Sequence, residues 1–70
     1  MPAFMRTALL KHRLMRAYEL RPAYQRNDYI GWIMRGKLKA TQQRRVQQML
    51  DELRAGGVYM NMKWNPKRAR

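Results

Sequence analysis

The amino-acid sequence predicts an all-α protein, a small bundle of three to four helices that ends in an extended C-terminal arm. Apolar residues recur at helical spacing through most of the first 57 positions. Proline and glycine interrupt that spacing at only a few places, which sets the segment boundaries. After Gly56-Gly57 the period changes to alternation, which is typical of extended chain. We therefore expect one helical domain over residues 1–57, an extended arm over 58–64 and a basic disordered tail over 65–70.

The first helical segment runs from Pro2 to about Leu20. Proline suits a first helical turn, where its missing N–H is not needed. One helical face of the segment carries Met1, Phe4, Met5, Ala8 and His12, and Leu9 lies beside it. No glycine or proline lies between its ends, so the sequence leaves open whether it forms one long helix or two short ones.

The second helix begins near Pro22 and reaches about Arg35. Arg21 ends the preceding segment, because a residue before proline is pushed out of the α region. At 100° per residue, the apolar side chains of this helix cover about 200° of arc. They are Tyr29, Ile30, Trp32, Ile33 and Met34. A helix this widely apolar packs on both sides, so we expect it to be the central helix of the bundle.

The last helix is predicted over Gln42 to Ala55, with Thr41 as its N-cap. Gly36 is the expected C′ residue of the preceding helix, and residues 37–40 form a basic loop between the two. The apolar stripe of the last helix has the i, i+3, i+4, i+7 pattern. It consists of Val46, Met49, Leu50 and Leu53.

The charge of the chain is strongly positive, with 16 Lys and Arg against 4 Asp and Glu and a formal net charge of +12. Self-repulsion at this density disfavours the compact state, and a polyanion relieves it. Nucleic acid, an anionic membrane and an acidic protein are therefore the candidate partners. The alternative is a solvated surface without a specific partner.

A run of bases without an acid lies between positions 35 and 45. If Thr41 is the N-cap, Arg44 and Arg45 occupy N3 and N4, where each positive charge costs roughly 0.3–1 kcal/mol against the helix dipole. Local rules broken without local compensation often mark functional contacts. The candidate anion-binding or partner-binding residues are Arg35, Lys37, Lys39, Arg44 and Arg45. A solvated face, or an arginine that reaches a cluster of backbone carbonyls, is the alternative.

The arm is the candidate surface for self-association. A single strand cannot satisfy its own backbone, so the arm must lie along the helices or pair with another chain. Its candidate residues are Val58, Tyr59, Met60, Met62 and Trp64. Aromatics beside arginines can also stack on bases in single-strand binders. At helical spacing, however, Tyr29 and Trp32 are expected to be core residues.

Catalysis has little support in the composition. The chain has no cysteine and no serine, and none of its four carboxylates is paired with a histidine. A single His12 makes no zinc site, and the Met60-x-Met62 spacing is read as packing. We therefore predict no enzyme activity, no cofactor, no metal and no small-molecule substrate. No apolar run approaches the ~18 residues of a membrane span, and a secretory signal pattern is lacking, so the expected location is cytoplasmic.

Three stretches, AYQRNDYIGWI, GKLKATQQRRV and QMLDELRAGGVYMNMKW, resemble the bacterial YdeI/OmpD-associated (OmdA) family, also called bacteriocin-protection proteins. Within the basic hallmark of that family, Lys37, Thr41, Arg45 and Val46 match. Gly36, Leu38, Lys39-Ala40 and Gln42 depart from it. The resemblance implies a small all-helical domain associated with envelope-stress resistance and, by name, with an outer-membrane porin. It supplies no catalytic residues.

The sequence thus predicts a non-enzymatic, basic helical interaction module that binds a protein partner or itself. Nucleic-acid binding through residues 35–45 and the tail is the alternative. An amphipathic membrane-surface role ranks last, because Phe4 and Leu9 are more useful to a small core than to a membrane.

Overall fold

The computed structural model describes residues 1–64 and confirms an all-α fold with a C-terminal arm. Four helices and two short strands follow one another along the chain. They are α1 (Ala3–Lys11), α2 (Met15–Glu19), α3 (Ala23–Met34), α4 (Lys39–Ala55), β1 (Val58–Tyr59) and β2 (Met62–Lys63). The predicted basic tail, residues 65–70, lies outside the described residues.

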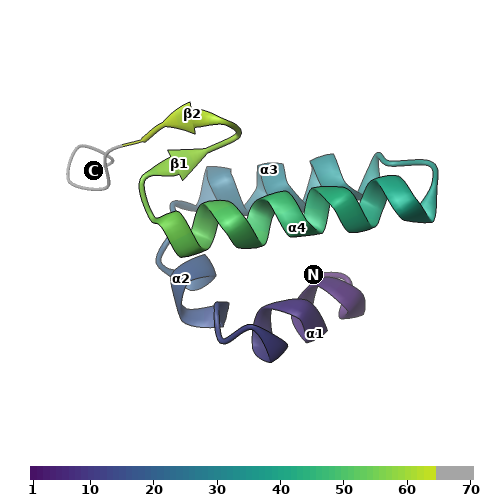
Figure 1. Cartoon of the computed structure of the whole chain (residues 1–70), viewed down its shortest axis with the longest axis horizontal. Helices are drawn as coiled ribbons and strands as arrows, with labels where there is room; N and C mark the ends of the chain where they lie inside the picture. Colours follow the sequence, from purple (N-terminus) through teal and green to yellow (C-terminus); the bar gives the residue numbers. More distant parts are fainter. Residues whose placement is uncertain (65–70) are drawn as a thin grey trace.

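Helix α4 occupies the centre of the molecule. It contacts α1, α2, α3 and β1, and Figure 1 shows α3 running along one side of it with α1 and α2 on another. The prediction that α3 is the central helix is therefore wrong. The wide apolar arc of α3 is only partly used, because Tyr29 and Ile33 are fully buried whereas Met34 remains 48% exposed.

The core gathers one apolar face from each helix around α4. The predicted stripe of α4 is confirmed, since all four of its residues are buried. The other helices contribute Met5, Leu9, Tyr18, Tyr29 and Ile33. Each fully buried side chain of this size contributes about 1.5–3 kcal/mol, so a core this small leaves little excess stability.

The N-terminal segment forms two helices, and a Schellman motif separates them. The N–H of Leu14 bonds to the carbonyl of Leu9 at 2.8 Å, and the N–H of Arg13 bonds to that of Leu10 at 3.2 Å. Arg13 adopts the left-handed conformation with φ of 58°. These are the two hydrogen bonds of the motif, and its two flanking apolar residues, Leu9 and Leu14, both belong to the core.

Helix α4 begins at Lys39 with Leu38 in the N-cap position, so the predicted Thr41 cap is wrong. The tight reversal after Gly36 explains the earlier start. A Cβ on Gly36 would lie 3.1 Å from Thr41 Cγ2, and Gln42 Nε2 donates to the Gly36 carbonyl at 2.8 Å. Thr41 is therefore packed inside the first turn. The arginines that follow fall in the second turn, where the helix dipole opposes them much less than predicted.

The arm turns back on itself as a two-stranded antiparallel hairpin, in which Val58 pairs with Lys63 and Tyr59 with Met62. The turn residues Met60 and Asn61 have φ of 50° and 61°. Two positive φ values in a two-residue loop define a type I′ turn. The arm is therefore a hairpin and not the single extended strand that the sequence predicts. Its backbone groups pair with each other within the same chain.

Candidate functional site

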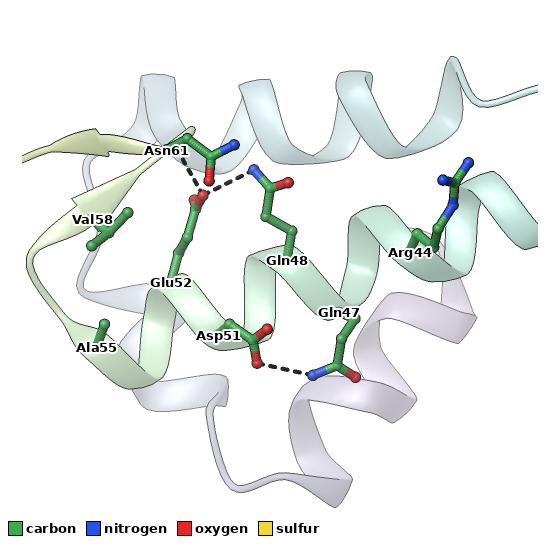
Figure 2. A pocket seen from close by; sticks show the side chains of 8 residues that line it. All are labelled: Arg44, Gln47, Gln48, Asp51, Glu52, Ala55, Val58 and Asn61. Atoms are coloured by element: carbon green, nitrogen blue, oxygen red, sulfur yellow. Dashed lines mark hydrogen bonds between the residues drawn. The ribbon is translucent and has the colours of Figure 1, made fainter.

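Glu52 is the centre of the polar network that holds the hairpin on α4. Its side chain is only 4% exposed. Its Oε1 accepts from the Tyr29 hydroxyl at 2.5 Å and from the Met60 N–H at 2.8 Å. Its Oε2 accepts from Gln48 Nε2 and from the Asn61 N–H, both at 2.9 Å. One buried carboxylate therefore binds both residues of the turn, as Figure 2 shows for Asn61 and Gln48.

The four donors fix the protonation of this network. Burial alone would raise the pKa of Glu52, but the hydrogen bonds from Tyr29, the turn amides and Gln48 outweigh it and hold that pKa below its usual value. Burial and the hydrogen bond to Glu52 raise the pKa of Tyr29. At neutral pH the tyrosine therefore keeps its proton and the carboxylate keeps its charge, which preserves the hydrogen bonds between them and to the turn.

Arg21 ties the arm to the helices from the other side. Its guanidinium donates to Gln25 Oε1 at 3.1 Å and to the backbone carbonyl of Glu52 at 3.0 Å. The same group lies 4.5 Å from the ring centroid of Trp64. The backbone N–H of Trp64 donates to the Gly57 carbonyl at 2.9 Å. The arm is thus anchored at its tip by Glu52 and at its base by Arg21.

Tyr59 of the hairpin packs edge-to-face against two tyrosines of α3, Tyr24 and Tyr29. The ring of Tyr59 lies 5.9 Å from that of Tyr24 and 5.6 Å from that of Tyr29, at interplanar angles of 84° and 85°. The Tyr59 hydroxyl also donates to the Asp28 carboxylate. Burial, followed by this hydrogen bond, raises the pKa of Tyr59. The prediction of Tyr29 as a core residue is confirmed, and Trp32 packs against the core as well.

An open groove of about 480 Å³ runs along the exposed side of α4 up to the hairpin. Figure 2 shows its side chains projecting from α4 and the arm. Its lining consists of Arg44, Gln47, Gln48, Asp51, Glu52, Ala55, Val58 and Asn61. The walls offer primary amides and apolar surface, whereas the one buried charge, Glu52, is already occupied by donors.

A second, more polar hollow of about 300 Å³ lies toward the start of α4, and we call it the basic pocket. Its lining is Thr41, Arg44, Arg45 and Gln48. The Arg45 guanidinium donates to the Trp32 carbonyl and lies 5.3 Å from the centroid of the Trp32 ring. Arg45 therefore reaches one backbone carbonyl, and not the cluster of carbonyls that the alternative names. Arg44 is exposed, and among residues 1–64 its guanidinium makes only a 3.5 Å contact with Thr41 Oγ1.

The five predicted anion-binding residues do not form a single cluster. Only Arg44 and Arg45 line the basic pocket. Arg35 is the C-cap of α3, and its guanidinium lies over Gly31, 3.2 Å from where a Cβ would be. Lys37 and Lys39 are exposed on and just after the connection between the two helices.

The candidate arm residues mostly contact their own chain. Val58 lines the groove, Met60 and Tyr59 pack against the core, and Trp64 covers Arg21. Met62 is the exception, with 59% of its side chain exposed. A role of these residues in self-association stays a prediction.

Sequence reasoning missed Glu52 and Arg21, the two residues that fix the arm. A partial signal for Glu52 exists in its spacing, because it lies three residues after Met49, next to the edge of the apolar stripe. A carboxylate on an apolar face requires buried donors. The donors themselves were not foreseeable, because two of them are backbone amides of a turn that the sequence did not predict.

Within residues 1–64, no group of three or more His, Cys, Asp or Glu side chains is placed to hold a metal ion. His12 is exposed at the C-cap of α1. Over the same residues, no helix is both long and apolar enough to cross a membrane.

The fold and this surface define a small helical protein with an open groove along its longest helix. The sequence profile of the family described as "Bacteriocin-protection, YdeI or OmpD-Associated" (OmdA) matches residues 1–56. The chain belongs to this family. No curated protein and no solved structure matches the sequence or the fold of the chain. The match includes all four helices and ends at Gly56, so the hairpin lies beyond the matched residues.

Proposed function

We propose that this protein is a non-enzymatic interaction module that binds a segment of a partner protein along α4. The observation that carries the proposal is the groove itself, which is open along one helix and closed at one end by the hairpin. Gln47, Gln48 and Asn61 supply amide donors and acceptors for a peptide backbone, and Ala55 and Val58 supply apolar contact.

The carboxylates of the groove support binding rather than catalysis. Glu52 accepts from four donors. Asp51 Oδ1 accepts from Gln47 Nε2 at 2.9 Å and from Arg54 at 3.4 Å. A general acid or base needs a perturbed pKa near the working pH and a free path to its substrate. Glu52 has neither, because its pKa is lowered and its oxygens are engaged.

Two glutamines on α4 offer a matched test. Gln47 lines the groove, whereas Gln43 is exposed one turn earlier and does not. The tagged protein and the variants Gln47→Tyr and Gln43→Tyr are each used to capture partners from native lysate treated with nuclease. We expect Gln47→Tyr to lose partner capture because the ring fills the groove, and Gln43→Tyr to retain it. Equal capture by both variants, or no capture after nuclease, would contradict the proposal.

The family description suggests that this binding serves bacteriocin protection, and we propose that role for the module. The test is the survival of bacteriocin-treated cells that lack the gene. Complementation by the wild type and by Gln43→Tyr, but not by Gln47→Tyr, is the expected result. Fractionation of the same cells tests the proposed cytoplasmic location.

Nucleic-acid binding is a second candidate, favoured by the charge distribution. Among the described residues, Arg54 with Asp51 is the only salt bridge. Glu52 is buried and Asp28 accepts from Tyr59, so few acids oppose the surface bases. Phosphate contacts make affinity fall steeply with salt. Fluorescence anisotropy with single-stranded and double-stranded oligonucleotides at two salt concentrations checks this candidate, and no binding at low salt would exclude it.

A further inference from the structure

We infer that the basic pocket of Thr41, Arg44, Arg45 and Gln48 is a carboxylate-binding subsite that receives an acidic side chain of the partner segment. This inference rests on the proposed function, since it adds a charged anchor to the same groove. The lining of the pocket holds two guanidiniums, a hydroxyl and an amide, and no carboxylate. It is therefore complementary to an anion.

The basic pocket and the groove are adjacent on α4. Arg44 and Gln48 belong to the lining of both. Most residues that line the two hollows recur at intervals of three and four positions, so they lie along one face of α4. They are at positions 41, 44, 45, 48, 51, 52 and 55. A single linear segment can therefore occupy both hollows at once.

Arg45 is held in place before any ligand arrives. Its guanidinium has five N–H donors, of which the Trp32 carbonyl uses one, and the Trp32 ring lies beside it. The Gln48 amide is fixed in the same way by its hydrogen bond to Glu52. Because these side chains are already ordered, binding an anion costs less conformational entropy than it would on free surface arginines. A guanidinium fork also matches the two oxygens of a carboxylate.

The rest of the groove favours an acidic peptide over a nucleic-acid strand. A polyanionic backbone that continued from the pocket would meet the Asp51 carboxylate and then the apolar surface of Ala55 and Val58. It would be repelled by the first and would gain little from the second. A peptide with one acid at the pocket and neutral or apolar residues beyond it fits the whole length.

Helix geometry sets the spacing of the two anchors. Arg45 and Ala55 are ten positions apart on α4, which at 1.5 Å per residue is about 15 Å. An extended peptide rises about 3.3 Å per residue, so its acidic and apolar anchors are about four to five residues apart. The partner segment thus carries an Asp or Glu at one end of this interval and an apolar residue at the other.

Two synthetic peptides test the inference by NMR titration of the ¹⁵N-labelled protein. One is acetyl-Glu-Gly-Gly-Gly-Gly-Leu-amide, and the other has Gln in place of Glu. We expect the glutamate peptide to shift the side-chain resonances of Arg45 and Gln48 together with the backbone amide of Val58. Its affinity should exceed that of the glutamine peptide about tenfold, because a charge-assisted pair is lost in the latter. Equal affinities, or shifts confined to other parts of the surface, would overturn the subsite.

Three charge-matched variants locate the binding. Arg45→Gln should weaken binding of the glutamate peptide about tenfold and Arg44→Gln severalfold, whereas Arg16→Gln, on the exposed surface of α2, should change it less than about twofold. Arg44→Gln removes no core contact, so it remains informative if Arg45→Gln fails to fold. Equal effects of all three variants would mean unspecific attraction and would also overturn the subsite.

A hexathymidine oligonucleotide is the competing probe. Stronger binding of this probe in the basic pocket than of the glutamate peptide would replace the acidic-peptide assignment with a nucleic-acid one. Partner capture that depends on Gln47 but ignores both arginines would reject the subsite and leave the proposed function standing. Peptide binding in the pocket without any partner capture would reject the proposed function alone.

Discussion

The two ends of the α4 surface use charge in opposite ways. At the hairpin end, the Glu52 carboxylate is buried and accepts from four donors of its own chain. Toward the start of the helix, Arg44 and Arg45 share a hollow in which most of their N–H groups face no acceptor among residues 1–64. One end is closed by internal bonds, whereas the other keeps hydrogen-bonding capacity for a partner.

This difference separates residues that build the fold from residues that are available for binding. A charge that is fully satisfied inside the chain is costly to remove, because its partners are then left unpaired in a dry environment. A charge with spare donors at the surface contributes little to stability. We therefore expect stability to depend on the hairpin end and partner affinity to depend on the basic end.

The largest effect is expected for Glu52→Ala. The substitution leaves the Tyr29 hydroxyl and the two turn amides without their acceptor, which should lower the free energy of unfolding by about 3 kcal/mol. Urea denaturation followed by circular dichroism measures it. Asp51→Ala, on the exposed neighbour, is the control and should cost less than about 0.5 kcal/mol. Similar losses for both would mean that the buried network does not hold the hairpin.

The pH dependence of stability gives the next largest effect. The pKa of Glu52 is lower in the folded state than its ordinary value of 4.5, so between the two values the unfolded chain binds more protons. The stability due to this group is therefore complete above the unfolded pKa and is lost as the pH falls through the folded one. Urea midpoints measured from neutral pH to below pH 4.5 should decline in the wild type. A Glu52→Gln variant should lack the part of the decline that comes from this group, and an unchanged decline would place its origin elsewhere.

A smaller difference is expected between the two arginines of the basic pocket. Arg45→Ala removes a hydrogen bond to the Trp32 carbonyl and the contact with the Trp32 ring, so it should cost about 1 kcal/mol of stability. Arg44→Ala removes only a long contact to Thr41 and should change stability by less than about 0.5 kcal/mol. Thermal unfolding of the two variants checks the order. A reversed order would show that Arg45 is not the anchored member of the pair.

The smallest effect concerns the turn. Asn61 has φ of 61°, a conformation that glycine adopts at no steric cost. Because Glu52 bonds to the backbone N–H rather than to the side chain, Asn61→Gly should keep that bond and raise stability by a few tenths of a kcal/mol. Chemical denaturation of the variant measures this change. A clear loss of stability would point to a contact of the Asn61 side chain that the hairpin requires.

The sequence predicted those parts of the fold that depend on local periodicity. The stripe of α4 was identified because its four apolar positions follow one helical period, and the end of α4 because Gly56 can adopt a left-handed cap. The sequence does not indicate the break between α1 and α2, because the left-handed residue there is Arg13 rather than glycine. Its cause is the burial of Leu9 and Leu14, which local sequence signals do not reveal.

The parts that failed depend on contacts between distant positions. The Thr41 cap was wrong because the close approach of Gly36 draws the threonine into the first turn. The hairpin was missed because its turn has the sequence Met-Asn rather than the favoured Asn-Gly. A carboxylate eight and nine positions earlier stabilises that turn. The groove could not be predicted at all, since it exists only where the arm returns onto α4.

The placement of the tryptophans has a practical consequence. The chain has two of them, and each lies against an arginine, Trp32 against Arg45 and Trp64 against Arg21. Replacing either one by phenylalanine leaves a single tryptophan, at the basic pocket or at the base of the arm. The emission of each single-tryptophan protein then reports whether a ligand or a mild denaturant disturbs one end of the molecule before the other, without an added dye.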